Sequence, residues 1–323
     1  MSMRAQVIHT LLLVLLFPFC ATAQKSYTPN ARYRIIIDND FSGDPDGLFQ
    51  LAHHLLSPSV DVVGVIGSPL TAEAGFDNTG NSALKACRKA KELMTVMGAS
   101  TDIPVVEDGA DLIVREAEST DARHLFVVCG AGLGSIAEAW KRKPEIAKRL
   151  TLIWIGGQEY DGLGITAPGA SKVEYNLMLD KEAARTVFNE SDLQIWQVPR
   201  NAYRQCLCSL AELIGQLREC GRTGDYLLRS LTDVMEGMKQ WNVQMGETYV
   251  LGDSPLVLLT ALQTGWEADP ASSDYVVLPA PRITSDGTYE QNPTGRLIRV
   301  YTRLDVRLLF ADMFMKFKTL RSL

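Results

Sequence analysis

Short apolar runs alternate with amphipathic segments along most of this sequence. The apolar runs are rich in β-branched residues and predict buried strands at residues 33–38, 60–67, 125–129, 152–155 and 193–198. Helical spacing of apolar positions predicts helices at residues 47–56, 81–97, 109–118, 135–141 and 181–188. A last strand and a closing helix are expected within residues 280–316. This alternation is typical of βαβ units and predicts an α/β fold, a Rossmann-like, open, mostly parallel sheet with helices on both faces.

The first two dozen residues have the pattern of a secretory signal peptide. Arg4 precedes an apolar run at 11–17, and small residues follow at Ala21 and Ala23. The run is too short to span a bilayer stably, so a membrane anchor is the weaker interpretation. We expect a signal peptide over 1–23, cleavage after Ala23, and an exported, periplasmic or extracellular protein. Residues 24–323 contain no repeat or obvious linker and are expected to form a single α/β domain.

The net charge of the chain indicates which kinds of molecule it can bind. The net charge is −6 and no run of Lys and Arg stands out, which argues against a nucleic acid polymer as partner. A small-molecule ligand is expected instead.

The cysteines are expected to be structural rather than catalytic. After cleavage five remain, which are Cys87, Cys129, Cys206, Cys208 and Cys220. An odd number leaves at least one unpaired, and a bridge from Cys206 or Cys208 to Cys220 stays open as an alternative.

An acidic loop follows the first predicted strand. Residues 38–47 read DNDFSGDPDG and carry Asp38, Asp40, Asp44 and Asp46. Four like charges this close together repel one another unless a cation compensates them. Oxygen ligands without His or Cys favour Ca²⁺ or Mg²⁺ over zinc. The alternative, a solvated turn with Asp46 capping the next helix, is typical of a surface loop, whereas this loop directly follows a buried strand.

The loop spacing partly fits an EF-hand, but two features exclude that motif. Phe49 stands where the bidentate Glu should be, and a strand rather than a helix precedes the loop.

The strand, aspartate cluster and apolar helix together resemble the nucleoside hydrolase family of the inosine-uridine preferring type. The family motif D-x-D-P-G-x-D-D appears here as the variant D-x-D-x-x-G-D-x-D. The resemblance continues in order along nearly the whole mature chain, through the segments NSAL (81–84), GAGLGSIA (130–137), IGG (155–157), EYN (174–176) and LGD (251–253). Each segment alone is weak, and their shared order and spacing carry the match.

The resemblance implies a Ca²⁺ site and a reaction. The implied metal ligands are the carboxylates of Asp40, Asp44, Asp46 and Asp253, with a backbone oxygen from Gly134. Asp40 is the implied general base, and Asp44 is the alternative. The implied reaction is hydrolysis of the N-glycosidic bond of a ribonucleoside.

Substrate contacts are implied at Asp38, Ser68, Glu174, Asn176 and Trp241. Glu174 and Asn176 would hold the ribose 5′-hydroxyl or its 3′ side. Trp241, like Tyr249 and Tyr160, is a candidate to stack on the base, although large aromatic residues more often serve burial.

Two departures from the family pattern bear on function. Gly67-Ser68 stands where many relatives have Asn, and Gly252 replaces a His that acts as the leaving-group acid in some relatives. The histidines of the mature chain, His53, His54 and His124, have no position that suggests catalysis. A substrate with a good leaving group, such as a cationic nicotinamide base, is one hypothesis for the missing acid. The alternatives to an enzyme are a catalytically degraded nucleoside- or sugar-binding protein and a calcium-stabilised structural domain. By analogy with the family, a homodimer or homotetramer is expected.

Overall fold

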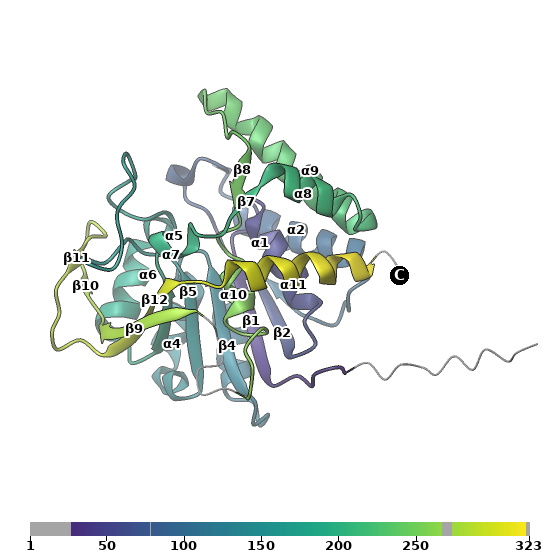
Figure 1. Cartoon of the computed structure of the whole chain (residues 1–323). Helices are drawn as coiled ribbons and strands as arrows, with labels where there is room; N and C mark the ends of the chain where they lie inside the picture. Colours follow the sequence, from purple (N-terminus) through teal and green to yellow (C-terminus); the bar gives the residue numbers. More distant parts are fainter. Residues whose placement is uncertain (1–26, 78, 267–272, 321–323) are drawn as a thin grey trace, which may run out of the picture.

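An eight-stranded sheet forms the centre of the protein (Figure 1). The computed structural model describes residues 27–77, 79–266 and 273–320. The strands follow the order β3-β2-β1-β4-β5-β6-β12-β9, and every neighbouring pair is parallel except β12 and β9. Their bounds are β1 (Tyr33–Asn39), β2 (Val60–Gly67), β3 (Val105–Val106), β4 (His124–Gly130), β5 (Leu150–Ile155), β6 (Gln194–Val198), β9 (Asp274–Pro279) and β12 (Leu297–Arg303). The predicted mostly parallel α/β sheet is confirmed.

Helices cover both faces of this sheet. The helices on one face are α1 (Asp46–Leu55), α2 (Ser82–Met97), α8 (Leu210–Leu217), α9 (Gly221–Gly237), α10 (Pro255–Leu258) and α11 (Val306–Thr319). Those on the other face are α3 (Ala110–Ala117), α4 (Gly134–Arg142) and α6 (Lys181–Arg185). Each layer buries its apolar side against the sheet, so the protein has two hydrophobic cores separated by one sheet.

Shorter elements connect these layers. They are the helices α5 (Tyr175–Leu179) and α7 (Arg200–Tyr203), the 3₁₀ turns η1 (Ala72–Ala74), η2 (Pro144–Lys148) and η4 (Met238–Trp241), and the paired strands β7 (Leu207–Ser209) with β8 (Thr248–Val250) and β10 (Arg282–Ile283) with β11 (Tyr289–Glu290). The helix predicted over 181–188 is α6 followed by a π-helical turn, η3 (Thr186–Glu190). The predicted ends of the other elements differ by one or two residues from the structure.

Side-chain alternation in β1 determines how the acidic loop begins. Ile35 and Ile37 belong to the core beneath α1, whereas Ile36 belongs to the core beneath α4. Because side chains of a strand alternate between faces, Asn39 leaves the strand on the first side and Asp38 on the second. The side chains of Asn39 and Asp38 therefore lie on opposite faces of the sheet.

Two further predictions concern the pairing of the cysteines and the amino-terminal segment. Cys87, Cys129, Cys206, Cys208 and Cys220 are all buried and unpaired, so the alternative of a bridge to Cys220 is wrong. In the part of the chain that the structure describes, no helix has the length and hydrophobicity needed to cross a bilayer. The predicted signal peptide, 1–23, lies outside the described residues.

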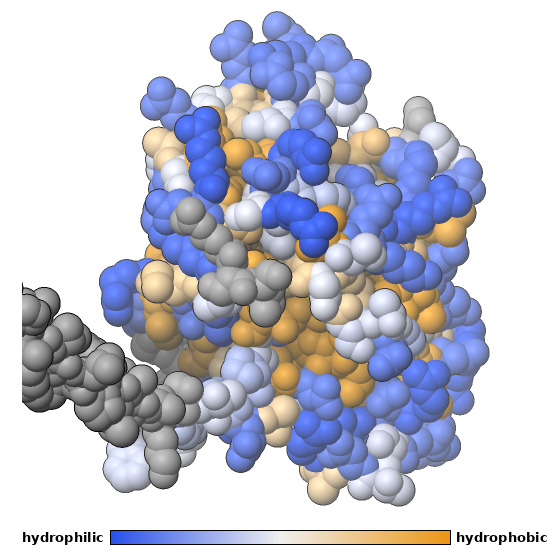
Figure 2. All heavy atoms as spheres, turned by 90° about the vertical axis from the view of Figure 1, so that its right-hand side faces the viewer, coloured by the Kyte–Doolittle hydropathy of each residue, from blue (hydrophilic) through white to orange (hydrophobic). Residues whose placement is uncertain are grey.

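Apolar side chains are not confined to the interior. On the face that Figure 2 shows, they gather near the centre, and hydrophilic side chains surround them. The homodimer or homotetramer expected from the sequence stays a prediction.

Candidate active site

A small polar cavity lies at the carboxyl edge of the sheet, where ligands bind in open α/β folds. Asn39, Gly130 and Ile155 end the neighbouring strands β1, β4 and β5 at this edge. The cavity has a volume of about 130 Å³ and is lined by Asp40, Asp44, Asp46, Gly130, Ile155, Glu174, Tyr175, Asn176, Tyr203, Gly252 and Asp253. The structure thus brings together four predicted metal ligands and two predicted substrate-binding residues.

The acidic loop folds back on itself between β1 and α1. The Gly43 amide donates to the Asp40 carbonyl at 2.7 Å, and the Asp46 amide donates to Asp44 Oδ1 at 3.1 Å. Asp46 then starts α1, where a carboxylate is favourable beside the helix amino terminus. These bonds turn three carboxylates toward one cavity.

Asp253 reaches the same cavity from a distant part of the chain. It lies between β8 and α10, and its backbone amide donates to Asp46 Oδ2 at 3.0 Å. Asn39 Nδ2 donates to Asp253 Oδ2 at 2.8 Å, and both residues are buried. A side chain at Gly130 would collide with this pair, because an added Cβ would lie 2.4 Å from Asp253 Oδ1. Asn39 and Gly130 thus complete the site, although sequence reasoning did not identify them.

The electrostatics of the cluster favour a cation. Burial raises the pKa of the Asp40, Asp46 and Asp253 carboxyls, and repulsion from the other acids raises it further. Ionised carboxylates gathered away from water need a compensating charge, either protons or a metal ion. The donors are hard oxygens, which suit a cation such as Ca²⁺ in chemical terms.

The side chains are near one another but do not yet converge on a single point. Among residues 27–77, 79–266 and 273–320, no three His, Cys, Asp or Glu side chains stand in a metal-binding arrangement. The chemistry of the donors nevertheless fits a hard cation.

Glu174 and its neighbours also line the cavity. It is the N-cap of α5, and its Oε2 accepts from the backbone amides of Gly157 at 2.7 Å and Leu177 at 3.1 Å. Its Oε1 accepts from the Tyr203 hydroxyl at 2.9 Å. Asn176 follows in the first turn of α5 and donates from Nδ2 to the Ile155 carbonyl at 2.8 Å. These hydrogen bonds fix the positions of Glu174 and Asn176 in the lining of the cavity.

Two predicted substrate-binding residues lie behind the cavity. Asp38 and Ser68 are fully buried, and the Ser68 hydroxyl donates to Asp38 Oδ1 at 2.5 Å. Within the described part of the chain, the other carboxylate oxygen of Asp38 has no hydrogen-bond partner, and burial raises the pKa of the Asp38 carboxyl to about 7. Neither Asp38 nor Ser68 is among the residues that line the cavity.

Two other predicted site residues lie apart from the cavity. Gly134 begins α4 beside the Asp180 carboxylate and does not line the cavity. Trp241 ends η4 with half of its surface exposed, so the structure does not support its expected stacking on a base. The local sequence does not show that α9 and η4 place Trp241 at the protein surface and outside the cavity.

None of the histidines that the structure describes lines the cavity. His53 bonds to Asp312 at 2.7 Å, His54 to Thr260 at 2.9 Å, and His124 to Thr151 at 3.0 Å. Burial lowers the pKa of His53 and His54, which keeps both neutral inside the helical layer. These contacts place all three histidines outside the lining of the cavity.

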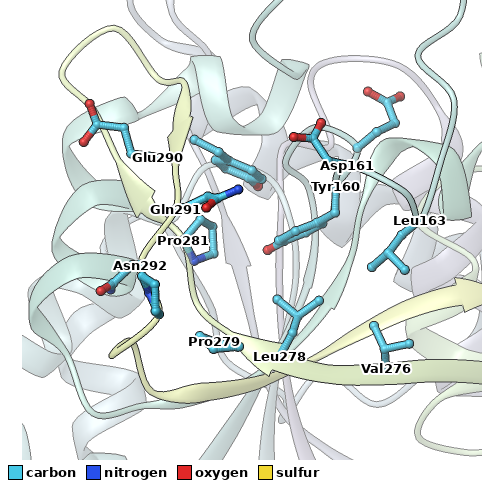
Figure 3. A pocket seen from close by; sticks show the side chains of 13 residues that line it. Tyr160, Asp161, Leu163, Val276, Leu278, Pro279, Pro281, Glu290, Gln291 and Asn292 are labelled. Carbon is cyan, nitrogen blue, oxygen red and sulfur yellow. The ribbon is translucent and has the colours of Figure 1, made fainter.

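A larger hollow lies elsewhere and has different chemistry. It measures about 530 Å³, between the loop after β5 and the segments around β9 and β11. Figure 3 shows Tyr160 reaching into it from the loop and Leu278 rising from β9. The Tyr160 hydroxyl donates to the buried side chain of Gln197, so this hydroxyl already has a partner. The smaller cavity, which gathers five carboxylates, is the better candidate for catalysis.

Together, this fold and this cavity define an α/β protein with a small polar cavity of clustered carboxylates at the carboxyl edge of its sheet. Comparison with known proteins narrows that class. A sequence model of the inosine-uridine preferring nucleoside hydrolase family matches residues 35–277. The inosine-uridine preferring nucleoside hydrolase of Crithidia fasciculata is 25% identical over 198 residues, which cover 61% of this chain and 55% of that enzyme.

Solved structures share the fold. The purine-preferring ribonucleoside hydrolase of Gardnerella vaginalis superposes with a TM-score of 0.66 at 17% identity, covering 89% of this chain and 99% of that one. The inosine-uridine preferring nucleoside hydrolase of Bacillus anthracis gives 0.63 at 15% identity, covering 88% and 99%. The chain belongs to the inosine-uridine preferring nucleoside hydrolase family, whose members are typically metal-dependent.

Proposed function

We propose that this protein is a calcium-dependent N-ribohydrolase that converts ribonucleosides into ribose and free base. One observation carries the proposal. Asp253 joins Asp40, Asp44 and Asp46 around a cavity that Glu174 and Asn176 also line. The site thus offers a cluster of acids for a cation and further polar side chains for a sugar.

Asp40, Asp44, Asp46 and Asp253 would hold the Ca²⁺, whose all-oxygen coordination they match. When bound, the ion supplies charge neutralisation and lowers the pKa of a coordinated water. Gly134, expected as a further ligand, is not included because it lies outside the lining.

Asp40 is the proposed general base. Its carboxylate lines the cavity and is buried, so it can meet a water molecule held beside the sugar. It accepts the proton of the attacking water. The remaining carboxylates stabilise the positive charge that develops on the ribose as the bond to the base breaks.

The size of the cavity indicates which part of a nucleoside it encloses. Its volume of about 130 Å³ is well below the roughly 300 Å³ from which drug-sized ligand pockets begin. We therefore place the sugar inside and the base at the opening. The sugar would then determine binding more strongly than the base.

The charge of the lining favours nucleosides over nucleotides. Five of the lining residues are acids, and none of the lining residues is Lys or Arg. A phosphate on the sugar would meet like charges at close range, which bound Ca²⁺ offsets only in part. We expect inosine to be hydrolysed and inosine 5′-monophosphate to be a poor substrate.

Departure of the base would proceed without a protonated histidine, since no histidine lines the cavity. The same observation favours a second candidate function, a nucleoside- or sugar-binding protein that has lost catalysis. It also motivates a preference for substrates whose base leaves readily, such as nicotinamide riboside. Equal turnover of inosine and nicotinamide riboside would count against that preference.

Release of ribose tests the proposed function directly. Inosine, uridine and nicotinamide riboside would each be incubated with the protein, with Ca²⁺ or with chelator, and Asp40→Asn would serve as the matched variant. We expect release that needs both Ca²⁺ and Asp40. Binding of inosine without release by the wild type would favour the binding protein.

Export and self-association are further proposals. The pattern of residues 1–23 supports secretion to the periplasm or the extracellular space. A homodimer or homotetramer is supported only by analogy with the family.

A further inference from the structure

We infer that Tyr203 is a positioning residue that fixes Glu174 against the 5′-hydroxyl of the bound ribose. The inference rests on the proposed function, because it assigns a role within the same sugar site. Its basis is the hydrogen bond between the two side chains and the fit of the tyrosine ring beside Gly252.

Tyr203 is brought to the cavity by the end of β6. The strand stops at Val198, Pro199 follows, and the single turn of α7 then presents Tyr203 to the cavity. Its hydroxyl donates to Glu174 Oε1 at 2.9 Å. Burial and the nearby Glu174 charge raise the pKa of this phenol, so it stays protonated and acts as a donor.

The two oxygens of Glu174 are held in different ways. Oε2 accepts two backbone amides, from Gly157 and Leu177, and Tyr203→Phe leaves both donors in place. Among the hydrogen bonds of the described residues, that with Tyr203 is the one that orients Oε1. Oε1 still has a lone pair for a ligand hydroxyl, because a carboxylate oxygen can accept two hydrogen bonds.

Gly252 provides the space that Tyr203 occupies. An added Cβ at this position would lie 3.3 Å from Tyr203 Cδ2 and 3.2 Å from Asp46 Oδ2, which is tighter than ordinary packing. The absence of a side chain at 252 thus allows the tyrosine ring and the carboxylate of Asp46 to lie side by side. Tyr203 and Gly252 form one continuous part of the wall.

The chemistry of ribose indicates which hydroxyl reaches Glu174. A ribonucleoside has a vicinal 2′,3′-diol and one separate hydroxyl at C5′. A vicinal diol can chelate a cation, so it is assigned to the side of Asp40, Asp44, Asp46 and Asp253. The 5′-hydroxyl is then the group left to meet Glu174 and Tyr203, which line the same cavity.

The variant Tyr203→Phe tests this inference. It removes one hydroxyl and keeps the ring beside Gly252. We expect KM and the Kd for inosine to rise about tenfold, which corresponds to about 1.4 kcal/mol at 25 °C, with kcat changed less than threefold. With 5′-deoxyinosine, which lacks the hydroxyl, the variant and the wild type should differ less than twofold.

Tyr226→Phe is the matched control. Tyr226 also donates to a carboxylate, Glu92 Oε2 at 3.3 Å, but it lies on α9 and does not line the cavity. It should match the wild type with both substrates. In a Glu174→Gln background, adding Tyr203→Phe should have a smaller effect than in the wild type, because the charge that the phenol orients is gone.

Two results would overturn the inference. One is a Tyr203→Phe protein with unchanged inosine binding, and the other is an equal loss with inosine and 5′-deoxyinosine. Failure of the proposed function is a different result, namely no ribose release by the wild type from any nucleoside. In that case the Kd values measured by calorimetry still decide the role of Tyr203.

Discussion

The side-chain amide of Asn39 donates to the carboxylate of Asp253 at 2.8 Å, although 214 residues separate them in the chain. Asn39 ends the central strand β1, and Asp253 follows β8. The bond keeps Asp253 beside Asp46 even though burial and like charges raise the pKa of both acids. The acidic cavity thus depends on a neutral donor at the end of β1.

Replacing that donor by a carboxylate should destabilise the metal-free protein. Asn39→Asp keeps the shape of the side chain but sets a further acid against Asp253. We expect a loss of about 1–3 kcal/mol in the free energy of unfolding, measured with urea in the presence of chelator. Part of the loss should return when Ca²⁺ is added, because the ion compensates the extra charge. Equal stability of variant and wild type in chelator would show that this bond does not hold the cluster.

The buried carboxyl of Asp38 should make metal-free stability depend on pH. Its pKa is about 7 in the folded protein against an ordinary value of 3.8. Between these values the folded state keeps a proton that the unfolded state has released, so stability falls as pH rises from about 4 to 7. The two pKa values limit this contribution to about 4 kcal/mol.

Asp38→Asn should remove that dependence while keeping an acceptor for Ser68. In chelator, the variant should unfold at higher urea than the wild type at pH 8, with the difference much smaller at pH 4. Asp161→Asn, at an exposed position, is the control and should leave the pH profile unchanged. A variant less stable than the wild type at pH 8 would indicate that Asp38 is needed in its ionised form.

Trp241 provides a test of the sequence-based assignment. Its side chain is half exposed on η4 and does not line the cavity. Trp241→Ala should therefore leave kcat and KM for inosine within about twofold of the wild type, as for other surface substitutions. A loss of tenfold or more would mean that η4 approaches the substrate when it binds.

The fold was largely predictable because each strand and helix has a local pattern. The apolar runs of β1, β2, β4, β5 and β6 alternate with helical spacing, and that alternation implies a parallel sheet. The small pairs β7–β8 and β10–β11 were not predicted, since strands of two or three residues leave too short a periodic signal.

The site was only partly predictable. Asp40, Asp44 and Asp46 form a dense local pattern, and Asp253 was found through the order of motifs. Asn39 stands within the same pattern, and side-chain alternation in β1 could have separated it from Asp38. Tyr203 carries no such signal, because its contact with Glu174 depends on how β6 and α5 meet in space.

Calorimetric titration of Ca²⁺ into chelator-treated protein tests the central claim, a cation held jointly by the acidic loop and Asp253. The wild type should bind one Ca²⁺ per chain, and Asp253→Asn should bind it at least tenfold more weakly, because one charged ligand is lost. Asp161→Asn should bind like the wild type. Absence of Ca²⁺ binding by the wild type, or equal affinity in Asp253→Asn, would contradict the account.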